Sequence, residues 1–243
     1  MALILCLETA TENCSVALFR DELLLGIRES SARNVHSSVL TLFIEEISRE
    51  AGVPLTALDA VAISMGPGSY TGLRIGVATA KGLCYALDKP MIAISTLQAM
   101  AAGMSHEIKK KNLVSADLPG TANPLLACPM IDARRMEVYC ALYDGQFREV
   151  EAVRAEIIDP DSFGPILGRG RVVFGGEGAQ KCRPALEGHP NALFLDHFSA
   201  SAQFMIHLAI AKFNRLEFEN LAYFEPFYLK DFIAGKPSVK GLR

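Results

Sequence analysis

The sequence predicts an α/β protein built from two tandem halves, each with the element order β-β-β-α-β-α. Two observations predict this class. Short apolar runs of strand length alternate with longer amphipathic segments, and a glycine-rich loop follows a buried strand in each half, at 66–69 and at 175–178. The same order of elements recurs at an offset of roughly 110 residues, although the two halves share little sequence, so the architecture repeats and the motifs do not.

The first half is expected to contain three strands followed by alternating helices and strands. Gly52 and Pro54 end its first helix, and Pro90 follows its second. The expected elements are strands at 3–9, 15–20 and 23–30, a helix from 37 or 38 to about 51, a strand at 60–64, a helix at 71–87, a strand at 91–94 and a short helix at 96–104.

A polar segment rich in structure-breaking residues, 105–123, predicts the boundary between a domain at 1–104 and a domain at 124–243. The second domain is expected to contain strands at 125–131, 138–143, 147–153 and 171–174, a helical stretch at 160–167, a helix after the second glycine loop and a long helix at 200–216. Two such halves facing each other form the architecture of the actin, Hsp70 and sugar-kinase superfamily. Function must still come from particular sites.

The composition excludes several classes of protein. Half of the 243 residues are hydrophobic, which is enough for a large core, and the formal net charge of −3 is not that of a protein that binds nucleic acid on its own. The six cysteines form no C-x-x-C pair, which is typical of buried thiols in a reducing compartment. The chain begins without a basic leader, and no apolar stretch approaches the ~20 residues that span a bilayer, so we expect a cytoplasmic protein with no membrane partner.

The two glycine loops and the first hairpin are candidates for an anion or nucleotide site. Glycines between a strand and a helix let backbone N–H groups approach an anion, and the helix dipole favours negative charge. A tight turn with no ligand explains the same glycines, and no Walker A pattern is present. The candidate residues are Glu8, Thr9 and Thr11 in the hairpin, Gly66, Gly68 and Ser69 in the first loop, and Gly175, Gly176 and Gly178 in the second.

The helix expected at 71–87 carries small residues on one side. Gly72, Gly76 and Ala80 repeat at a spacing of four, which lets another element approach the backbone closely. Each interior glycine costs a helix about 1 kcal/mol relative to alanine, so two on one stripe require an offsetting contact. That contact is either the chain's own sheet or a second protein.

The eleven residues Gly66-Pro-Gly-Ser-Tyr-Thr-Gly-Leu-Arg-Ile-Gly76 resemble the signature of the TsaB (YeaZ) family. The segments 5–18, 130–139 and 226–230 resemble other conserved parts of that family, with Glu8 in place of its usual Asp and Lys230 in place of its usual Arg. The resemblance implies a two-domain actin-like fold and a non-catalytic subunit that activates the catalytic subunit TsaD, with the ATPase TsaE joining the pair. That complex transfers a threonylcarbamoyl group from its adenylate to adenosine 37 of tRNA. No cofactor of its own is implied, and ATP or ADP acts only at the level of the complex.

The residues also argue against an active site in this chain. The catalytic relative carries a His-x-x-x-His metal pair, and Thr96 and Met100 occupy the matching positions here, where neither is a good ligand for a hard metal. The five histidines form no metal-binding pair, so no metal site is expected and a metalloprotease is disfavoured. An actin-like kinase or ATPase remains an alternative. It needs an acidic residue in each half, and Asp132 is the plausible second acid.

We expect the helix that ends near 51 and the helix at 71–87 to pack against the equivalent helices of TsaD as a helical bundle. The apolar face of the helix that ends near 51 is wide, because two i, i+4 stripes run along it. Homodimerisation through the same face is expected when the partner is absent. The residues expected at this interface are His36, Val39, Leu40, Phe43, Ile47, Tyr70, Gly72, Arg74, Gly76 and Ala80.

Overall fold

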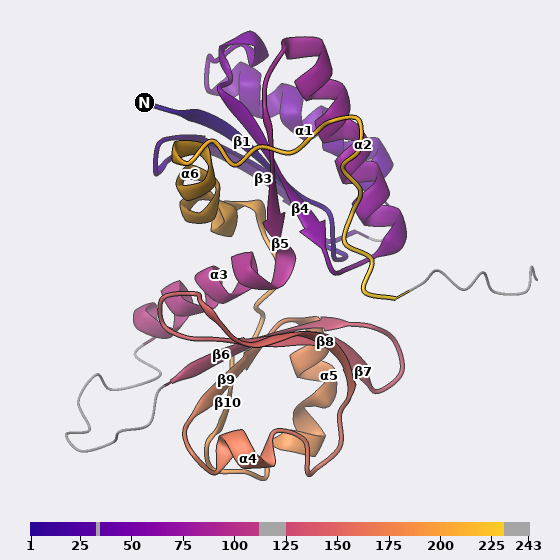
Figure 1. Ribbon diagram of the computed structural model, residues 1–243, viewed down its shortest axis with the longest axis vertical. Coiled ribbons are helices and arrows are strands. Elements are labelled where there is room, and N and C mark those ends of the chain that lie inside the picture. Colours follow the sequence, from indigo (N-terminus) through magenta and orange to yellow (C-terminus); the bar gives the residue numbers. More distant parts are fainter. Residues whose placement is uncertain (33–34, 112–124, 231–243) are drawn as a thin grey trace, which may run out of the picture.

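The computed structural model describes residues 1–32, 35–111 and 125–230, and it confirms the α/β class. Two five-stranded sheets lie one above the other, each with helices packed against it (Figure 1). The first sheet and its neighbours comprise β1 (Leu3–Glu8), β2 (Cys14–Arg20), β3 (Leu23–Ser30), α1 (His36–Glu50), β4 (Ala60–Gly66), α2 (Tyr70–Leu87), β5 (Met91–Ser95) and α3 (Thr96–Lys110). The remaining elements are β6 (Leu126–Asp132), β7 (Glu137–Tyr143), β8 (Glu149–Ile157), α4 (Gly164–Leu167), β9 (Val172–Gly175), α5 (Glu177–Leu186), β10 (Ala192–Phe194) and α6 (Ile206–Asn214).

The two sheets share one topology, which confirms the predicted repeat. Their strand orders are β3-β2-β1-β4-β5 and β8-β7-β6-β9-β10. In each sheet the central strand, β1 or β6, pairs antiparallel with the next strand of the chain and parallel with a later one, β4 or β9. The sequence did not predict β10, because three residues are too few to show a periodicity.

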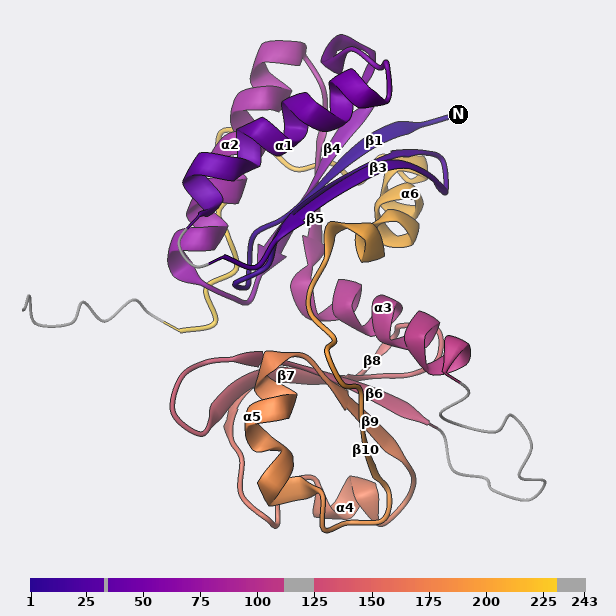
Figure 2. The same ribbon diagram turned by 180° about the vertical axis from the view of Figure 1, so that it is seen from behind.

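Two helices are exchanged between the halves (Figures 1 and 2). Helix α3 follows β5 in the chain, but its apolar residues, among them Met100 and Met104, pack with the second sheet. Helix α6 comes late in the chain, but Ile206 and Ala209 pack against the first sheet. The domains expected at 1–104 and 124–243 therefore need correction. We call the first sheet with α1, α2 and α6 the first lobe, and the second sheet with α3, α4 and α5 the second lobe.

The predicted linker also needs correction at its start, because residues 105–110 belong to α3. The polar side chains of this stretch lie on the exposed side of the helix, whereas Ile108 is buried. Most of the remaining linker, 112–123, lies outside the described residues.

After α6, residues 215–230 form a segment without regular helix or strand, which we call the strap. It crosses the edge of the first sheet and runs beside α2 (Figure 1). The N–H of Glu219 donates to the carbonyl of Met91 at 2.9 Å, and the N–H of Phe227 donates to the carbonyl of Met65 at 2.7 Å. At the end of the strap, Lys230 forms an ion pair with Glu137 on β7, so the strap also links the two lobes.

All six cysteines are buried and unpaired, as predicted. Within the part of the chain that the structure describes, no helix is both long and apolar enough to cross a membrane.

Candidate functional site

The first glycine loop is filled by the protein itself. The N–H of Ser69 donates to the carbonyl of Ala10 at 2.7 Å, and the Ser69 hydroxyl caps α2 by accepting from the N–H of Gly72 at 3.2 Å. A Cβ atom on Gly68 would overlap the backbone of Ala10. Gly66 has a φ of +114°, and a Cβ there would meet the carbonyl of Phe227 in the strap. These glycines therefore let the β1–β2 turn and the strap approach the loop closely.

The small-residue stripe of α2 contacts the protein's own sheet. A Cβ on Gly72 would overlap the carbonyl of Thr9, and a Cβ on Gly76 would overlap the hydroxyl of the same residue. Ala80 is fully buried in the same core. The sequence left open whether this stripe contacts the chain's own sheet or a second protein. In the structure it contacts the sheet, so the assignment of these three residues to a partner interface is wrong.

Three of the α1 residues expected at the interface are also internal. His36 is 9% exposed, and its Nε2 donates to the carbonyl of Thr11 at 2.9 Å. Leu40 and Ile47 belong to the core under the first sheet, where Ile47 packs against Gly26. The wide apolar face predicted for this helix is therefore mostly used by its own lobe, and Val39 and Phe43 remain half-buried at the margin.

Helices α1 and α2 lie beside each other on one face of the first sheet (Figure 2). Their outward side carries a different set of residues, which we call the docking face. Leu42 is 47% exposed and Tyr85 is 86% exposed. Nothing lies within 4 Å of a Cβ built on Gly82. The face consists of Leu42 on α1 and of Ala78, Gly82, Tyr85 and Ala86 on α2. Val39 and Phe43 share a stripe of α1 with Glu46 and Glu50, which pair with Arg28 on the edge strand β3, so this stripe faces away from α2. Sequence reasoning missed the Ala78, Gly82, Ala86 series, although its spacing of four matches the buried stripe.

Tyr70 and Arg74, which were expected at the interface, meet the strap. The rings of Tyr70 and Tyr228 have centroids 4.9 Å apart, and the Arg74 guanidinium lies 5.4 Å from the Tyr70 ring centroid. Arg74 Nη1 also donates to the Tyr70 hydroxyl at 3.1 Å. These residues belong to a groove of about 370 Å³ between α2 and the strap. Its lining residues are Tyr70, Arg74, Val77, Ala78, Lys81, Phe224, Glu225, Pro226 and Tyr228.

Glu8 lies at the carboxyl end of β1 and is fully buried. Its Oε1 accepts from the N–H of Ala10 at 2.7 Å, whereas Oε2 has no hydrogen-bond partner within the described residues. Burial and, to a smaller extent, the charge of Glu177 in the second lobe raise the pKa of this carboxyl from 4.5 to about 7. Thr9 lies beside it, and its N–H donates to the Ser64 hydroxyl at 3.2 Å.

The second glycine loop is packed as tightly as the first. Gly176 has a φ of +107°, and a Cβ there would overlap the carbonyl of Met130 on β6. Cβ atoms on Gly175 and Gly178 would also press against neighbouring side chains or backbone. Burial raises the pKa of Glu177, which lies within this loop and is the first residue of α5. The structure thus brings Glu177 of the second loop near Glu8. Two carboxyl groups therefore lie where the two lobes meet.

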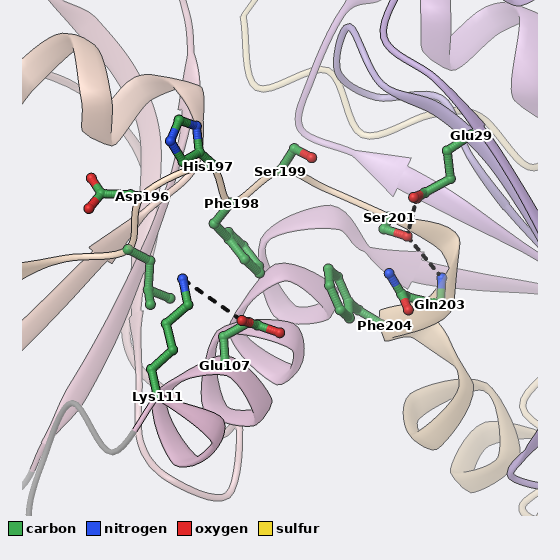
Figure 3. Close-up of a pocket in the computed structure, with 11 residues that line it drawn as sticks. Glu29, Glu107, Lys111, Asp196, His197, Phe198, Ser199, Ser201, Gln203 and Phe204 are labelled. Carbon is green, nitrogen blue, oxygen red and sulfur yellow. Dashed lines mark hydrogen bonds and ion pairs between the residues drawn. The ribbon is translucent and has the colours of Figure 1, made fainter.

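A second cavity, of about 360 Å³, lies where residues 195–204 cross between the lobes (Figure 3). The rings of Phe198 and Phe204 stack at 5.4 Å. Its carboxyl groups are engaged by the chain: the Ser201 hydroxyl donates to Glu29, and Glu107 lies 3.9 Å from Lys111. This cavity could not be predicted from the sequence, because its residues come from distant segments.

The positions that match the metal ligands of the catalytic relative are internal. Thr96 is fully buried at the start of α3, and Met100 packs against Gly176. Across residues 1–32, 35–111 and 125–230, no group of three or more His, Cys, Asp or Glu side chains is arranged to hold a metal ion.

A family model and several known proteins are similar to this chain. A family model described as "TsaD: tRNA N6-adenosine threonylcarbamoyltransferase" matches residues 24–233. The tRNA threonylcarbamoyladenosine biosynthesis protein TsaB of Escherichia coli is 40% identical over 140 residues, which are 58% of this chain and 54% of that protein. The Bacillus subtilis TsaB is 31% identical over 140 residues, again 58% of this chain and 54% of that protein. The matched stretch thus spans about half the length of these curated relatives.

Solved structures and a catalytic relative extend the comparison. The structure of YeaZ from Pseudomonas aeruginosa is 27% identical with a TM-score of 0.69, covering 94% of this chain and 100% of that one. A tRNA N6-adenosine threonylcarbamoyltransferase of Novosphingobium aromaticivorans is 30% identical over 174 residues, which are 69% of this chain and 44% of that protein. The chain belongs to the TsaB/YeaZ family of tRNA threonylcarbamoyladenosine biosynthesis proteins, within the wider group that the TsaD family model matches.

Proposed function

We propose that this chain is a non-catalytic subunit that activates TsaD by binding it through the docking face of α1 and α2. In this proposal the complex installs threonylcarbamoyl on adenosine 37 of tRNA in the cytoplasm. TsaE joins the complex, tRNA is bound by the assembly, and ATP or ADP acts only there. The same face forms a homodimer when TsaD is absent.

The exposed small-residue series on α2 carries the proposal. Ala78, Gly82 and Ala86 lie on one exposed line of a helix, where no described residue comes within 4 Å of a Cβ built on Gly82. Small side chains let a second helix approach closely, and the exposed Leu42 and Tyr85 would supply apolar area around the contact. Exposed apolar patches bordered by polar residues commonly mark protein interfaces.

The non-catalytic role is supported by the residues at the seam between the lobes. A hydroxyl and a thioether, at Thr96 and Met100, replace the metal-binding pair, and both residues are buried. The first glycine loop packs against Ala10, whose carbonyl accepts the hydrogen bond that the N–H of Ser69 could otherwise donate to a phosphate.

Gly82→Leu tests the docking face. A leucine at this position has free space within the chain but would prevent close approach of a partner helix. We expect Gly82→Leu to abolish co-elution with TsaD in size-exclusion chromatography and to abolish tRNA modification in a reconstituted system. The variant should also elute as a monomer on its own.

Gly82→Ala is the matched control, because it changes the same position but keeps a small residue. It should retain the complex and the modification activity. If Gly82→Leu still binds TsaD as the wild type does, the docking face is wrong. If the chain binds TsaD but its addition does not change tRNA modification, the activator role is wrong.

A further inference from the structure

The groove between α2 and the strap combines aromatic rings with cations. Tyr70, Arg74 and Lys81 project from one side of α2, because residues four and eleven positions apart fall on the same helix face. The strap supplies the opposite wall with Phe224 and Tyr228. The groove faces away from the buried stripe of α2. Ala78 lines the groove and also belongs to the docking face.

The charges of the groove favour an anionic ligand. Arg74 and Lys81 line it, and Glu225 is the single acidic residue among its lining residues. Arg74 is exposed on the second turn of α2, so its guanidinium is accessible to a ligand. Within the described residues, the Arg74 side chain donates one hydrogen bond, from Nη1 to the Tyr70 hydroxyl, so Nε and Nη2 can still donate to an anion.

The aromatic residues favour a ligand that also carries a flat ring. The paired rings of Tyr70 and Tyr228 give a surface that is partly exposed, since Tyr228 is 37% exposed. A volume of about 370 Å³ is in the range of small-molecule sites and is larger than a phosphate alone requires. Base stacking on aromatic side chains, with cations along the backbone, is the usual basis of single-strand recognition.

We propose that this groove binds a nucleotide unit of single-stranded RNA, with the base on the Tyr70–Tyr228 pair and the phosphate on Arg74 and Lys81. The proposal rests on the proposed function only for its choice of RNA as the source of the nucleotide. Double-stranded RNA would not suit the groove, because its bases are stacked on each other and cannot reach the tyrosines. With a net charge of −3, the isolated chain should bind RNA weakly and only at low salt.

The test is fluorescence anisotropy of a labelled oligoadenylate of about ten nucleotides with the full chain. We expect Arg74→Ala/Lys81→Ala to weaken binding by at least about tenfold and to reduce the salt dependence. Tyr228→Leu should weaken binding by about fivefold or more without changing the salt dependence, because it removes only stacking. AMP should compete if a single nucleotide fills the groove, and an RNA duplex should bind less well than the single strand.

Lys109→Ala/Lys110→Ala is the matched control, since it removes the same charge from exposed positions on α3. The proposal is overturned if this control weakens RNA binding as much as the groove variant, if the wild type binds no RNA, or if duplex and single strand bind equally. It is also overturned if Arg74→Ala/Lys81→Ala loses TsaD while keeping RNA, because the groove is then a protein interface. Gly82→Leu is scored on TsaD binding without RNA, so the two proposals fail separately.

Discussion

At the scale of single residues, Glu8 is one of the groups through which the two lobes interact electrostatically. It is enclosed at the end of β1, one of its oxygens accepts a backbone hydrogen bond, and Glu177 of the second lobe acts on it. A buried carboxylate without enough partners is strongly disfavoured, so the carboxyl retains its proton to about pH 7.

Glu8 should make the stability of the fold depend on pH. Its pKa rises from 4.5 in the unfolded chain to about 7 in the folded one, so the folded state binds more protons between these values. The free energy of unfolding therefore falls as the pH rises through this window, by an amount on the order of 3 kcal/mol for this group. Glu8→Gln stays neutral, and its urea-unfolding free energy should fall less steeply over the same window.

The control for this prediction is Glu187→Gln, which removes a carboxyl from an exposed position. Its pH profile should follow that of the wild type. Because burial also raises the pKa of Glu177, some slope will persist in Glu8→Gln. A Glu8→Gln profile parallel to that of the wild type would show that Glu8 is ionised in the folded protein.

At the scale of elements, α2 presents three different surfaces. One stripe is buried against Thr9 and Ile63, one side forms the docking face with α1, and one side lines the groove. Gly76 and Gly82 are both glycines within this helix, but they belong to different surfaces. Their substitution therefore separates the role of the helix in the fold from its role at the surface.

Alanine at these two positions should change stability in opposite directions. Gly76→Ala forces a methyl group against the Thr9 hydroxyl and Ile63, so we expect a loss of about 1–3 kcal/mol in the free energy of unfolding. Gly82→Ala meets open space and replaces a poor helix former, so a gain of up to about 1 kcal/mol is expected. Thermal unfolding followed by circular dichroism measures both. Equal effects at the two sites would contradict the burial of the Gly76 stripe.

The sequence predicted the elements of the first lobe well and their surfaces poorly. Periodicity located α2 to within one residue, because its signal and the stop at Pro90 are local features of the sequence. Periodicity also showed that Gly72 and Gly76 share a side, but it could not say which element that side contacts. The groove was not predicted, because it depends on a strap that returns from more than 130 residues away to reach Tyr70.

At the scale of the whole molecule, the helix exchange joins the lobes more firmly than a single linker would. Ile206 of α6 covers one face of the first sheet, and Met104 of α3 packs with the second sheet, so each sheet depends on a helix from the other half of the sequence. Further links are the Lys230–Glu137 ion pair and the Asn13 side chain, which donates to the carbonyl of Ala200 at 2.8 Å. Neither half of the sequence contains all of its own core.

The exchange predicts that the halves defined by the sequence do not fold alone. A fragment of residues 1–104 lacks α6, which leaves apolar residues such as Ala62 and Ile92 of the first sheet uncovered, and it should be unfolded or aggregated. Fragments 1–111 and 125–243, produced together, should associate into one folded complex, because together they contain every described element. Circular dichroism and co-purification measure this. Cooperative unfolding of fragment 1–104 by itself would show that the first sheet does not depend on α6.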